Sequence, residues 1–450
     1  MASIEDLAPI AEKAVRKALD MGADEAEAYV SATRSTSVVI ESGKIKEFNH
    51  TVDAGIGLRV SLARKVGFAY TTRLGASFIG EAVARAIQSA RASSEDKWWP
   101  GLPGPQKYAS IPGTFSEELA HTEPSALVEY AREIMDAVRE AGSEFVLAHA
   151  AVSVSASETY IVNTNGLEGV DRGTHSSIYA SILARVNGLV TPEVFSIGSS
   201  RVSIPSPSPV VEKSLSVVRE CTVKAKLDGG GYDVVFMPAA LAEIIGEALL
   251  PSLTAERVAR KRSLYGGMLG EKVMDERVTI IDDGALESGD ASSKFDGEGV
   301  ATKRKLLVER GVLKSFIADT YWGHRIGMSS TGNAVRRGYS TRPGTGYTNV
   351  LMQAGDAGLD ELVEGRVLVV HYVQGAHTAN ADTGEYSVVA NPAILYENGE
   401  ARGWVPGVVL AGNIGTHMSK DIVAISKTLE KPYPAVHLPA VRLKDVKVLQ

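Results

Sequence analysis

The 450-residue chain contains a single cysteine, Cys221, and no apolar run of membrane-spanning length. One thiol cannot form an intrachain disulfide, so the composition indicates a reducing compartment. Cys221 lies inside the helical pattern VVRECTVKA, which favours a packing role over a nucleophilic one. The N-terminus carries charges throughout and lacks the apolar centre of a signal peptide. We therefore expect a cytoplasmic protein with no membrane partner.

Basic residues are outnumbered by acidic ones, because the chain has 47 Lys and Arg residues and 54 Asp and Glu residues. The resulting net charge of -7 repels a polyanion, so nucleic-acid binding would need a local basic patch. The compact run Lys303, Arg304 and Lys305 precedes three apolar residues, a pattern more typical of a solvated strand end. We expect no nucleic-acid partner.

Hydrophobic residues make up 44% of the chain, enough to build ordinary globular cores. Residues 1–97 are predicted to form an α+β module. An amphipathic helix begins at the N-cap Ser3 and stops before Gly22. Short β-branched runs between residues 26 and 72 follow, and their tight turns require antiparallel pairing. A second amphipathic helix is expected over Ala76–Ala92.

Residues 98–113 are crowded with proline and glycine and indicate a connector, in which Trp98 and Trp99 are expected to cover a seam between modules. Residues 114–226 are predicted to repeat the layout of helix, antiparallel sheet and helix. The first of these helices is expected to be capped by Thr122.

Residues 227–450 are predicted to be rich in β-structure. Residues 228–231 form a flexible glycine joint, and a strand and a helix follow directly. Hairpin signals recur at Glu309-Arg310-Gly311 and Glu397-Asn398-Gly399, so a mostly antiparallel sheet that curls toward a barrel is expected. The predicted fold class is α+β, with an N-terminal helix and antiparallel-sheet half and a β-rich, barrel-like C-terminal half.

Two groups of side chains suggest metal chemistry. An acidic, glycine-rich segment could hold Mg²⁺ or Ca²⁺, but its spacing does not match an EF-hand and a solvated loop is the commoner interpretation. His371 and His377 are the closest histidine pair. They would lie about 20 Å apart on a continuous strand, so a bend at Gly375 would have to bring them together. The acidic residues of the glycine-rich segment that could hold Mg²⁺ or Ca²⁺ are Asp282, Asp283, Asp290, Asp296 and Glu298.

The predicted helix after Pro238 contains Gly246-Glu247-Ala248-Leu249-Leu250-Pro251. This segment resembles the H-E-x-x-x-H helix of the TldD/PmbA metallopeptidase family, with Gly246 and Pro251 in the histidine positions. Neither residue offers a side-chain donor, so a zinc site cannot be built here. Gly246 in a helix interior costs about 1 kcal/mol relative to Ala, which a close packing contact could explain.

Other segments share this resemblance in order along nearly the entire chain. They are Glu41-Ser42-Gly43, GIGLRV, RSLYGGMLGEKV, FDGEGV, ERGVLKSFIADTY, SSTGNA, YTNV, DTGEYS and AGNI. The TldD-like branch of the family has a further cysteine ligand near the C-terminus, whereas this chain has no cysteine after Cys221. The sequence therefore looks like the PmbA branch, also called TldE, whose members act beside a zinc-bearing partner on unfolded or short peptides.

The loop from Ser329 to Val350 is rich in small polar residues, and such long loops often serve binding. Loop composition and position in the family make seven of its residues candidates for contact with substrate. They are Ser330, Thr331, Gly332, Asn333, Tyr347, Thr348 and Asn349.

The main hypothesis is a catalytically silent subunit that holds no cofactor of its own and forms a heterodimer with a zinc-bearing TldD-like subunit. In this reading no residue is catalytic, and Glu247 is the relic of a general base. One alternative is an independent hydrolase that uses His371, His377 and the acidic loop. The other is a non-enzymatic, peptide-binding homodimer.

Overall fold

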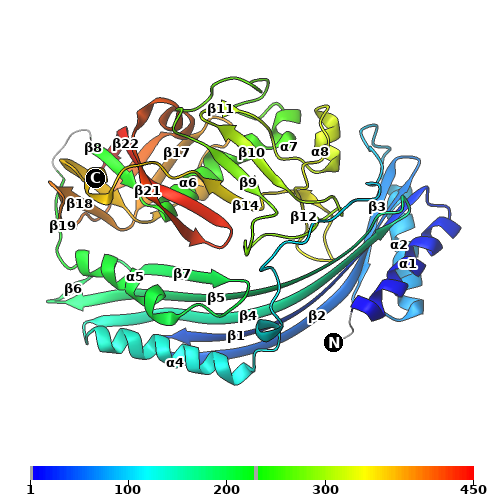
Figure 1. The fold of residues 1–450 in the computed structure, drawn as a ribbon, viewed down its shortest axis with the longest axis horizontal. Helices are drawn as coiled ribbons and strands as arrows, with labels where there is room; N and C mark the ends of the chain where they lie inside the picture. Colours follow the sequence, from blue (N-terminus) through cyan, green and yellow to red (C-terminus); the bar gives the residue numbers. More distant parts are fainter. Residues whose placement is uncertain (1–3, 228–231) are drawn as a thin grey trace.

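The computed structural model describes residues 4–227 and 232–450. The predicted N-cap Ser3 and the predicted joint at residues 228–231 lie outside these residues. A long, curved N-terminal sheet forms a half-barrel beneath a β-rich C-terminal body (Figure 1). This arrangement confirms the predicted α+β fold class. In the described residues, no helix is both long and apolar enough to cross a membrane.

The N-terminal sheet is antiparallel and has the strand order β3-β2-β1-β4-β5-β6, with β7 also paired to β5. Its strands are β1 (Glu25–Glu41), β2 (Lys44–Leu62), β3 (Lys65–Thr71), β4 (Phe145–Asn163), β5 (Glu168–Val186), β6 (Leu189–Val190) and β7 (Val194–Ser200).

The strands of this sheet are longer than the sequence predicted. Each of β1, β2 and β4 joins two runs that were expected to be separate. β1 pairs with β4 continuously from Glu27↔Asn163 to Glu41↔His149. The strands of residues 1–97 and 114–226 therefore belong to one sheet, because a pairing distant in sequence joins them.

Helices cover the outer face of this sheet, to which its even-numbered residues such as Val30, Val38 and Val152 point. One end packs against α1 and α2, and the other against α4 and α5. The helices of this half are α1 (Ile4–Asp20), α2 (Ala76–Ala92), α3 (Glu117–Ala120), α4 (Pro124–Ala141) and α5 (Pro207–Glu220).

The N-terminus of α4 differs from the prediction, whereas Cys221 after α5 agrees with it. Thr122 does not cap α4, because its hydroxyl donates to the Leu119 carbonyl at the end of α3 (2.9 Å) and Glu123 is the N-cap. Cys221 is the residue after α5 and is fully buried. Burial raises the pKa of its thiol to about 12, which agrees with a packing role.

The outer edge of β3 is covered by side chains, whereas the edge of the first part of β2 is open. Side chains of α2 occupy the outer edge of β3: Arg85 donates to the Tyr70 carbonyl, and Ser93 donates to the Val66 carbonyl. In contrast, β3 pairs with β2 only from Ile56 onward. The edge of β2 from residue 44 to 55 pairs with no strand in the described part of the chain, so its backbone groups stay open for pairing.

The C-terminal body contains a branched 13-stranded sheet that is mostly antiparallel. The exceptions are the parallel pairs β14–β22 and β8–β15. The strands are β8 (Tyr232–Phe236), β9 (Ile280–Asp283), β10 (Arg304–Glu309), β11 (Val312–Leu313), β14 (Asn349–Met352), β15 (Arg366–Val370), β16 (Val373–Gln374), β17 (Glu385–Ala390), β18 (Ala393–Glu397), β19 (Glu400–Trp404), β20 (Val409–Asn413), β21 (Ile422–Tyr433) and β22 (Val436–Leu449), with a separate pair β12 (Ala334–Val335) and β13 (Gly344–Thr345).

The largest apolar core of this body surrounds helix α6. Both predicted hairpins are present, because Arg310 and Gly311, and likewise Asn398 and Gly399, adopt the positive φ that such turns require. The helices of this body are α6 (Pro238–Ala248), α7 (Ala255–Ala259), α8 (Thr320–Arg325), α9 (Leu359–Leu362) and α10 (Ile414–Thr416), with short 3-10 segments at Leu250–Leu253 and Ala376–Thr378 and a π-helical turn at His417–Asp421.

A buried charge network ties the two halves together. Arg59 of β2 lies 2.7 Å from Glu27 of β1 and 2.8 Å from Glu298 of the C-terminal body. Arg336 reaches the other oxygen of Glu27. Burial opposes the charge on Arg59, but the two glutamates outweigh it and hold its pKa above the ordinary value. The network therefore fixes the sheet against the C-terminal body.

The connector also crosses this seam, as the sequence predicted. The guanidinium of Arg325 lies over the ring of Trp98 at 5.3 Å. Trp99 donates from its indole to Glu25 (3.0 Å), and the Tyr108 hydroxyl donates to the Gly299 carbonyl (2.8 Å). Residues 98–113 thus reach both halves.

The first testable prediction concerns Arg59. We expect Arg59→Met to lower the free energy of unfolding by about 3–5 kcal/mol, because it leaves Glu298 buried without its cation. The measurement is urea denaturation followed by tryptophan fluorescence and circular dichroism.

The matched control is Arg132→Met, which removes an exposed pair with Glu129 (2.6 Å). Its effect should stay below about 1 kcal/mol, since exposed pairs contribute little. Equal effects of the two substitutions would contradict the role given to the buried network.

Candidate functional site

The inner face of the half-barrel is lined with small hydroxyl side chains. Four cross-strand pairs of β1 and β4 put serine or threonine on both strands, because alternate residues of a strand point to the same side. Their neighbours along each strand are mostly apolar or small and face the helices. We call these residues the hydroxyl face: Ser31↔Thr159, Thr33↔Ser157, Ser35↔Ser155 and Ser37↔Ser153.

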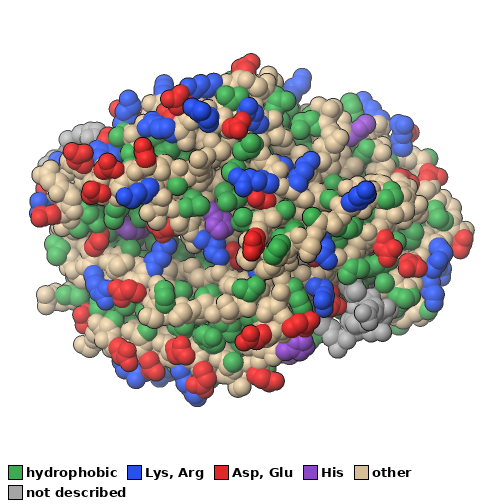
Figure 2. Space-filling view, in the orientation of Figure 1, with side chains coloured by type: hydrophobic (Ala, Val, Ile, Leu, Met, Phe, Trp, Pro, Cys, Tyr) green, Lys and Arg blue, Asp and Glu red, His purple; other side chains and the backbone are tan. Residues whose placement is uncertain are grey.

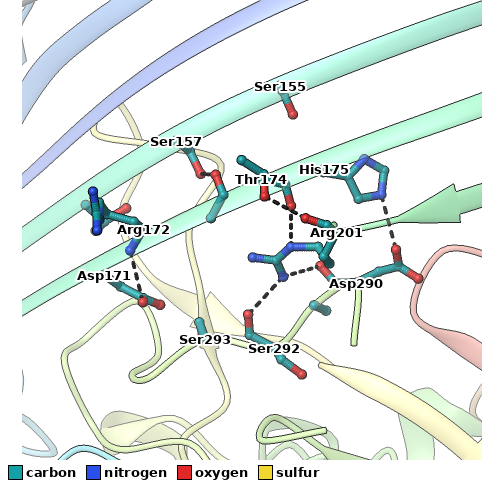
Figure 3. A pocket seen from close by; sticks show the side chains of 13 residues that line it. Ser155, Ser157, Asp171, Arg172, Thr174, His175, Arg201, Asp290, Ser292 and Ser293 are labelled. Carbon is teal, nitrogen blue, oxygen red and sulfur yellow. Dashed lines mark hydrogen bonds and ion pairs between the residues drawn. The ribbon is translucent and has the colours of Figure 1, made fainter. Parts of the chain in front are cut away.

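A cavity of about 300 Å³ separates one end of the hydroxyl face from the C-terminal body. Ser155, Ser157 and Thr159 form its wall on the sheet, together with Asp171 and His175 of β5. Ala291, Ser292 and Ser293 form the opposite wall. In Figure 3, the labelled residues Ser155, Ser157 and His175 lie on the side of the sheet, and Ser292 and Ser293 lie on the side of the C-terminal body.

A second cavity of about 210 Å³ adjoins the first, because Thr159, Asp171, Ala291 and Ser293 line both. It extends past Tyr29 and Phe295 to Tyr347 and Thr348 of the C-terminal body. We call the two adjoining cavities the chamber. Its walls carry hydroxyl groups from both halves, so a ligand inside would meet polar groups on both sides.

Asp290 is a fixed negative charge at the wall of the chamber. Its Oδ1 lies 3.4 Å from Nε2 of His175, and its Oδ2 accepts from Lys431 (3.0 Å) and from the backbone N–H of Ala435 (3.2 Å). Burial would raise the pKa of Asp290, but the contacts with His175 and Lys431 outweigh it and hold the pKa below its ordinary value.

Arg201 clamps the wall of the chamber in place. Its guanidinium donates to the carbonyls of Gly289, Asp290 and Ser292 at 3.1 Å each. Further bonds reach the carbonyls of Thr114 and Thr174. Burial lowers the pKa of Arg201. Backbone carbonyls therefore occupy its donors, so Arg201 positions the loop and is not free for a ligand.

The predicted substrate residues fall into two groups. Tyr347 and Thr348 line the chamber. Asn333 and Asn349 are completely buried, and Thr331 nearly so. Asn333 donates to Asp282 (2.8 Å) and to the Gly346 carbonyl (2.9 Å), so it holds two loop segments together.

Ser330 and Gly332 lie at the start of the same loop. The Ser330 hydroxyl donates to the Ala318 carbonyl (3.3 Å) and stays half-buried. Gly332 has a φ of 73°, and a Cβ there would meet the Ala301 carbonyl oxygen at 2.5 Å. Asn349 donates to the Asp283 carbonyl (2.6 Å). Contact of these residues with substrate stays a prediction, but their side chains already shape the loops that border the chamber.

The predicted solvation is wrong for Lys305 and for the acidic segment, whereas Lys303 and Arg304 are exposed as expected. Lys305 is 7% exposed and lies 2.7 Å from Asp282, which is completely buried. Asp283, Asp296 and Glu298 are also buried, and the side chain of Asp290 is 3% exposed. Each carboxylate is held by a cation or by backbone N–H groups within the protein. The tertiary partners that make burial tolerable are distant in sequence and invisible to a local reading.

The end of α6 cannot hold zinc. Gly246 is exposed, and a Cβ built there would meet nothing within 4 Å, so the expected close packing contact is absent and that explanation is wrong. Glu247 is exposed, and Pro251 sits in the 3-10 segment that follows the helix. One carboxylate without imidazole or thiolate neighbours does not fit a zinc ion. The Tyr347 hydroxyl donates to the Leu250 carbonyl and links this helix end to the chamber.

The histidine pair does not form a metal site either. The chain turns at Gly375, which has a φ of 92°. His377 is exposed, whereas His371 faces a cavity of about 40 Å³ and burial lowers its pKa to about 4. Among the residues that the structure describes, no three His, Cys, Asp or Glu side chains gather as metal ligands would.

Sequence reasoning missed the hydroxyl face, Arg201, and the contacts of Asp290 with His175 and Lys431. The alternation in ATRSTSVV and VSVSASET signals a strand with one hydroxyl-lined side. Nothing in the local sequence indicates that both segments face the same chamber, because this depends on the register of β1 with β4.

Family models match three parts of the chain. The PmbA/TldA metallopeptidase C-terminal domain matches residues 229–450, domain 1 matches residues 26–94, and the central domain matches residues 117–204. An uncharacterized protein of Methanocaldococcus jannaschii is 30% identical over 376 residues, which are 84% of this chain and 86% of that protein. Metalloprotease PmbA of Escherichia coli O157:H7 is 25% identical over 445 residues, which are 96% of this chain and 94% of that protein.

The crystal structure of TldE from Thermococcus kodakarensis has the same fold. It superimposes with a TM-score of 0.90 at 28% sequence identity. The match covers 98% of this chain and 100% of that chain.

The second prediction separates a structural role from a binding role for Asn333. We expect Asn333→Ala to lower the free energy of unfolding by about 1–3 kcal/mol, because it strands the buried polar groups that the amide now satisfies. Thermal unfolding of the purified variant provides the measurement.

Ser330→Ala in the same loop is the control and should change stability by less than about 1 kcal/mol, since it removes one neutral hydrogen bond. The structural role given to Asn333 would be refuted by a variant that keeps wild-type stability.

Proposed function

Because the chain belongs to the TldD/PmbA metallopeptidase family, we propose that it is the zinc-free subunit of a peptidase complex. In this proposal a zinc-bearing relative supplies hydrolysis. This chain contributes part of the chamber in which an unfolded or short peptide is held.

The observation that carries the proposal is the donor set at the end of α6. Gly246 and Pro251 stand where the family motif has histidines, and no cysteine follows Cys221. Glu247 remains, but a glutamate acts in a zinc peptidase by taking a proton from metal-bound water. Without ligands for the metal, this chain alone has no such water to activate.

The chamber supports a role in holding peptide. It lies between the hydroxyl face and the loops that carry Tyr347 and Thr348. Tyr347 in turn contacts the carbonyl of Leu250 beside the degenerate motif. A peptide in the chamber would therefore lie next to the helix end at which the family's catalytic chemistry is expected.

The free edge of β2 supports pairing with a partner subunit. Since α2 bonds the backbone of Val66, Phe68 and Tyr70 in β3, the even-numbered residues of β2 direct their backbone groups away from β1. Val52 lies on this open edge and its side chain is 53% exposed. A relative with the same fold has an edge of its own and could pair with it.

The third prediction tests the division of labour. We expect the purified chain to contain no stoichiometric zinc and to leave an unstructured peptide intact. Mixing it with a zinc-bearing TldD-like relative should yield a complex that cleaves the peptide. Elemental analysis, light scattering and mass spectrometry of the products measure the three quantities.

Stoichiometric zinc together with cleavage by the chain alone would overturn the proposal. In that case His371→Ala and His377→Ala test the independent hydrolase, which must lose turnover. A stable homodimer that ignores the relative and cleaves nothing would instead favour the peptide-binding scaffold.

The fourth prediction concerns the β2 edge. We expect Val52→Pro to weaken the complex with the zinc-bearing relative at least about tenfold, because proline removes a donor that faces the open edge. The affinity is measured by analytical ultracentrifugation.

Val52→Thr keeps the backbone N–H and serves as the matched control. Both variants should unfold near the wild-type temperature, since in the described residues no strand pairs with the edge at which the proline variant loses its donor. Assembly at full affinity by the proline variant would place the interface elsewhere.

A further inference from the structure

We infer that the hydroxyl face is a track for an extended peptide and binds its backbone rather than particular side chains. This inference rests on the proposed peptide substrate and assigns it a site. The site consists of the eight hydroxyl side chains of β1 and β4 defined above, with the chamber at one end.

The first step is that several of these hydroxyls are free. Ser153 is bonded to Ser177 (2.8 Å), and Ser157 donates weakly to the Gly173 carbonyl (3.4 Å). In the described residues, five hydroxyls of the hydroxyl face, four on β1 and one on β4, have no protein partner. These free groups are Ser31, Thr33, Ser35, Ser37 and Ser155.

The second step is that the free hydroxyls are accessible. Each of these side chains is half-buried, whereas the intervening residues Ala32, Thr36 and Val38 are buried against the other face. Figure 3 shows Ser155 above the chamber without a dashed contact. Ser155 lines the chamber, and the four free hydroxyls of β1 lie beside it on the same face of the sheet. Unpaired donors in this position are available to a ligand.

The third step is the match in chemistry and length between the hydroxyl face and an extended peptide. A hydroxyl both donates and accepts, so neighbouring serines can serve the N–H and the C=O of a peptide alike. Six residue steps separate Ser31 from Ser37, which corresponds to about 20 Å of extended chain. The hydroxyl side chains are short and alike, so they offer the same groups to the backbone of any peptide sequence.

The fourth step excludes an anionic ligand. A nucleic acid or a phosphate would need free cations. In the part of the chain that the structure describes, the cations lining the chamber are engaged: Arg201 by carbonyls, Arg336 by Glu27, and His175 by Asp290. The remaining one, Arg172, lies over the ring of Phe115 at 4.5 Å and within 3.6 Å of Glu117.

The surface around the chamber points the same way. On the face drawn in Figure 2, basic and acidic side chains are interspersed over both halves. Asp171 and Asp290 add negative charge to the chamber itself. A neutral backbone therefore suits the hydroxyl face better than a polyanion does.

The test measures binding of a fluorescein-labelled, unstructured peptide to the full chain by fluorescence anisotropy. The double variant Ser35→Ala with Ser155→Ala removes two free hydroxyls that face each other across β1 and β4. We expect it to bind about tenfold more weakly, because two hydrogen bonds to the peptide are lost. Its unfolding temperature should not change.

The matched control is the double variant Ser216→Ala with Ser419→Ala, which removes two exposed hydroxyls outside the chamber. It should bind as the wild type does. A scrambled peptide of the same composition should bind within about threefold of the original. A peptide with N-methylated backbone amides should bind more weakly, because it lacks the donors that the hydroxyls accept.

Three results would overturn the inference: unchanged affinity of the Ser35 and Ser155 variant, equal binding of the N-methylated peptide, or displacement of the peptide by an oligonucleotide. Absence of peptide binding by both the chain and its mixture with the zinc-bearing relative would also overturn it. If hydroxyl-dependent binding is found but the relative neither pairs nor cleaves, the inference stands and the proposed division of labour fails.

Discussion

The contact on which the rest depends is the buried guanidinium of Arg59 between Glu27 and Glu298. Arg59, Glu27 and Glu298 lie on β2, on β1 and in the C-terminal body, and a charge taken out of water must keep its partners in place. The half-barrel and the C-terminal body therefore meet in one fixed arrangement at this point. Away from this contact the half-barrel and the C-terminal body do not have to touch, and the chamber occupies the space between them.

This explains why the inner face of the half-barrel can be polar. In the described residues, apolar contact between the halves comes from a small cluster around Ile161, Leu167 and Phe295 and from the ring of Phe195, which lies against Tyr372 (4.4 Å) and Tyr433 (6.3 Å). Helices bury the outer face instead and provide the larger cores. A sheet held by ions at one end and covered by helices outside needs no apolar residues on its inner side, so serine and threonine can line it without loss of stability.

Local sequence predicted what depends on local physics. Helix faces and hairpin turns such as Asn398-Gly399 follow from spacing and backbone preference. The register of β1 with β4, the burial of Lys305 beside Asp282 and the clamp of Arg201 on residues 289–292 depend on partners distant in sequence. The candidate site is built mostly from such contacts. The alternating serines therefore predicted a strand but not the chamber that it faces.

The degenerate motif and the chamber illustrate two different constraints on one chain. Gly246 touches nothing that a larger residue would displace, and Glu247 is exposed. Side chains at these positions can therefore change with little effect on folding, and metal ligands there would be needed for chemistry alone. The walls of the chamber differ, because Asn333 and Arg201 hold the loops that shape it. Changes at Gly246 and Glu247 can therefore leave the form of the chamber unchanged, because the contacts that hold its walls lie on other elements of the fold.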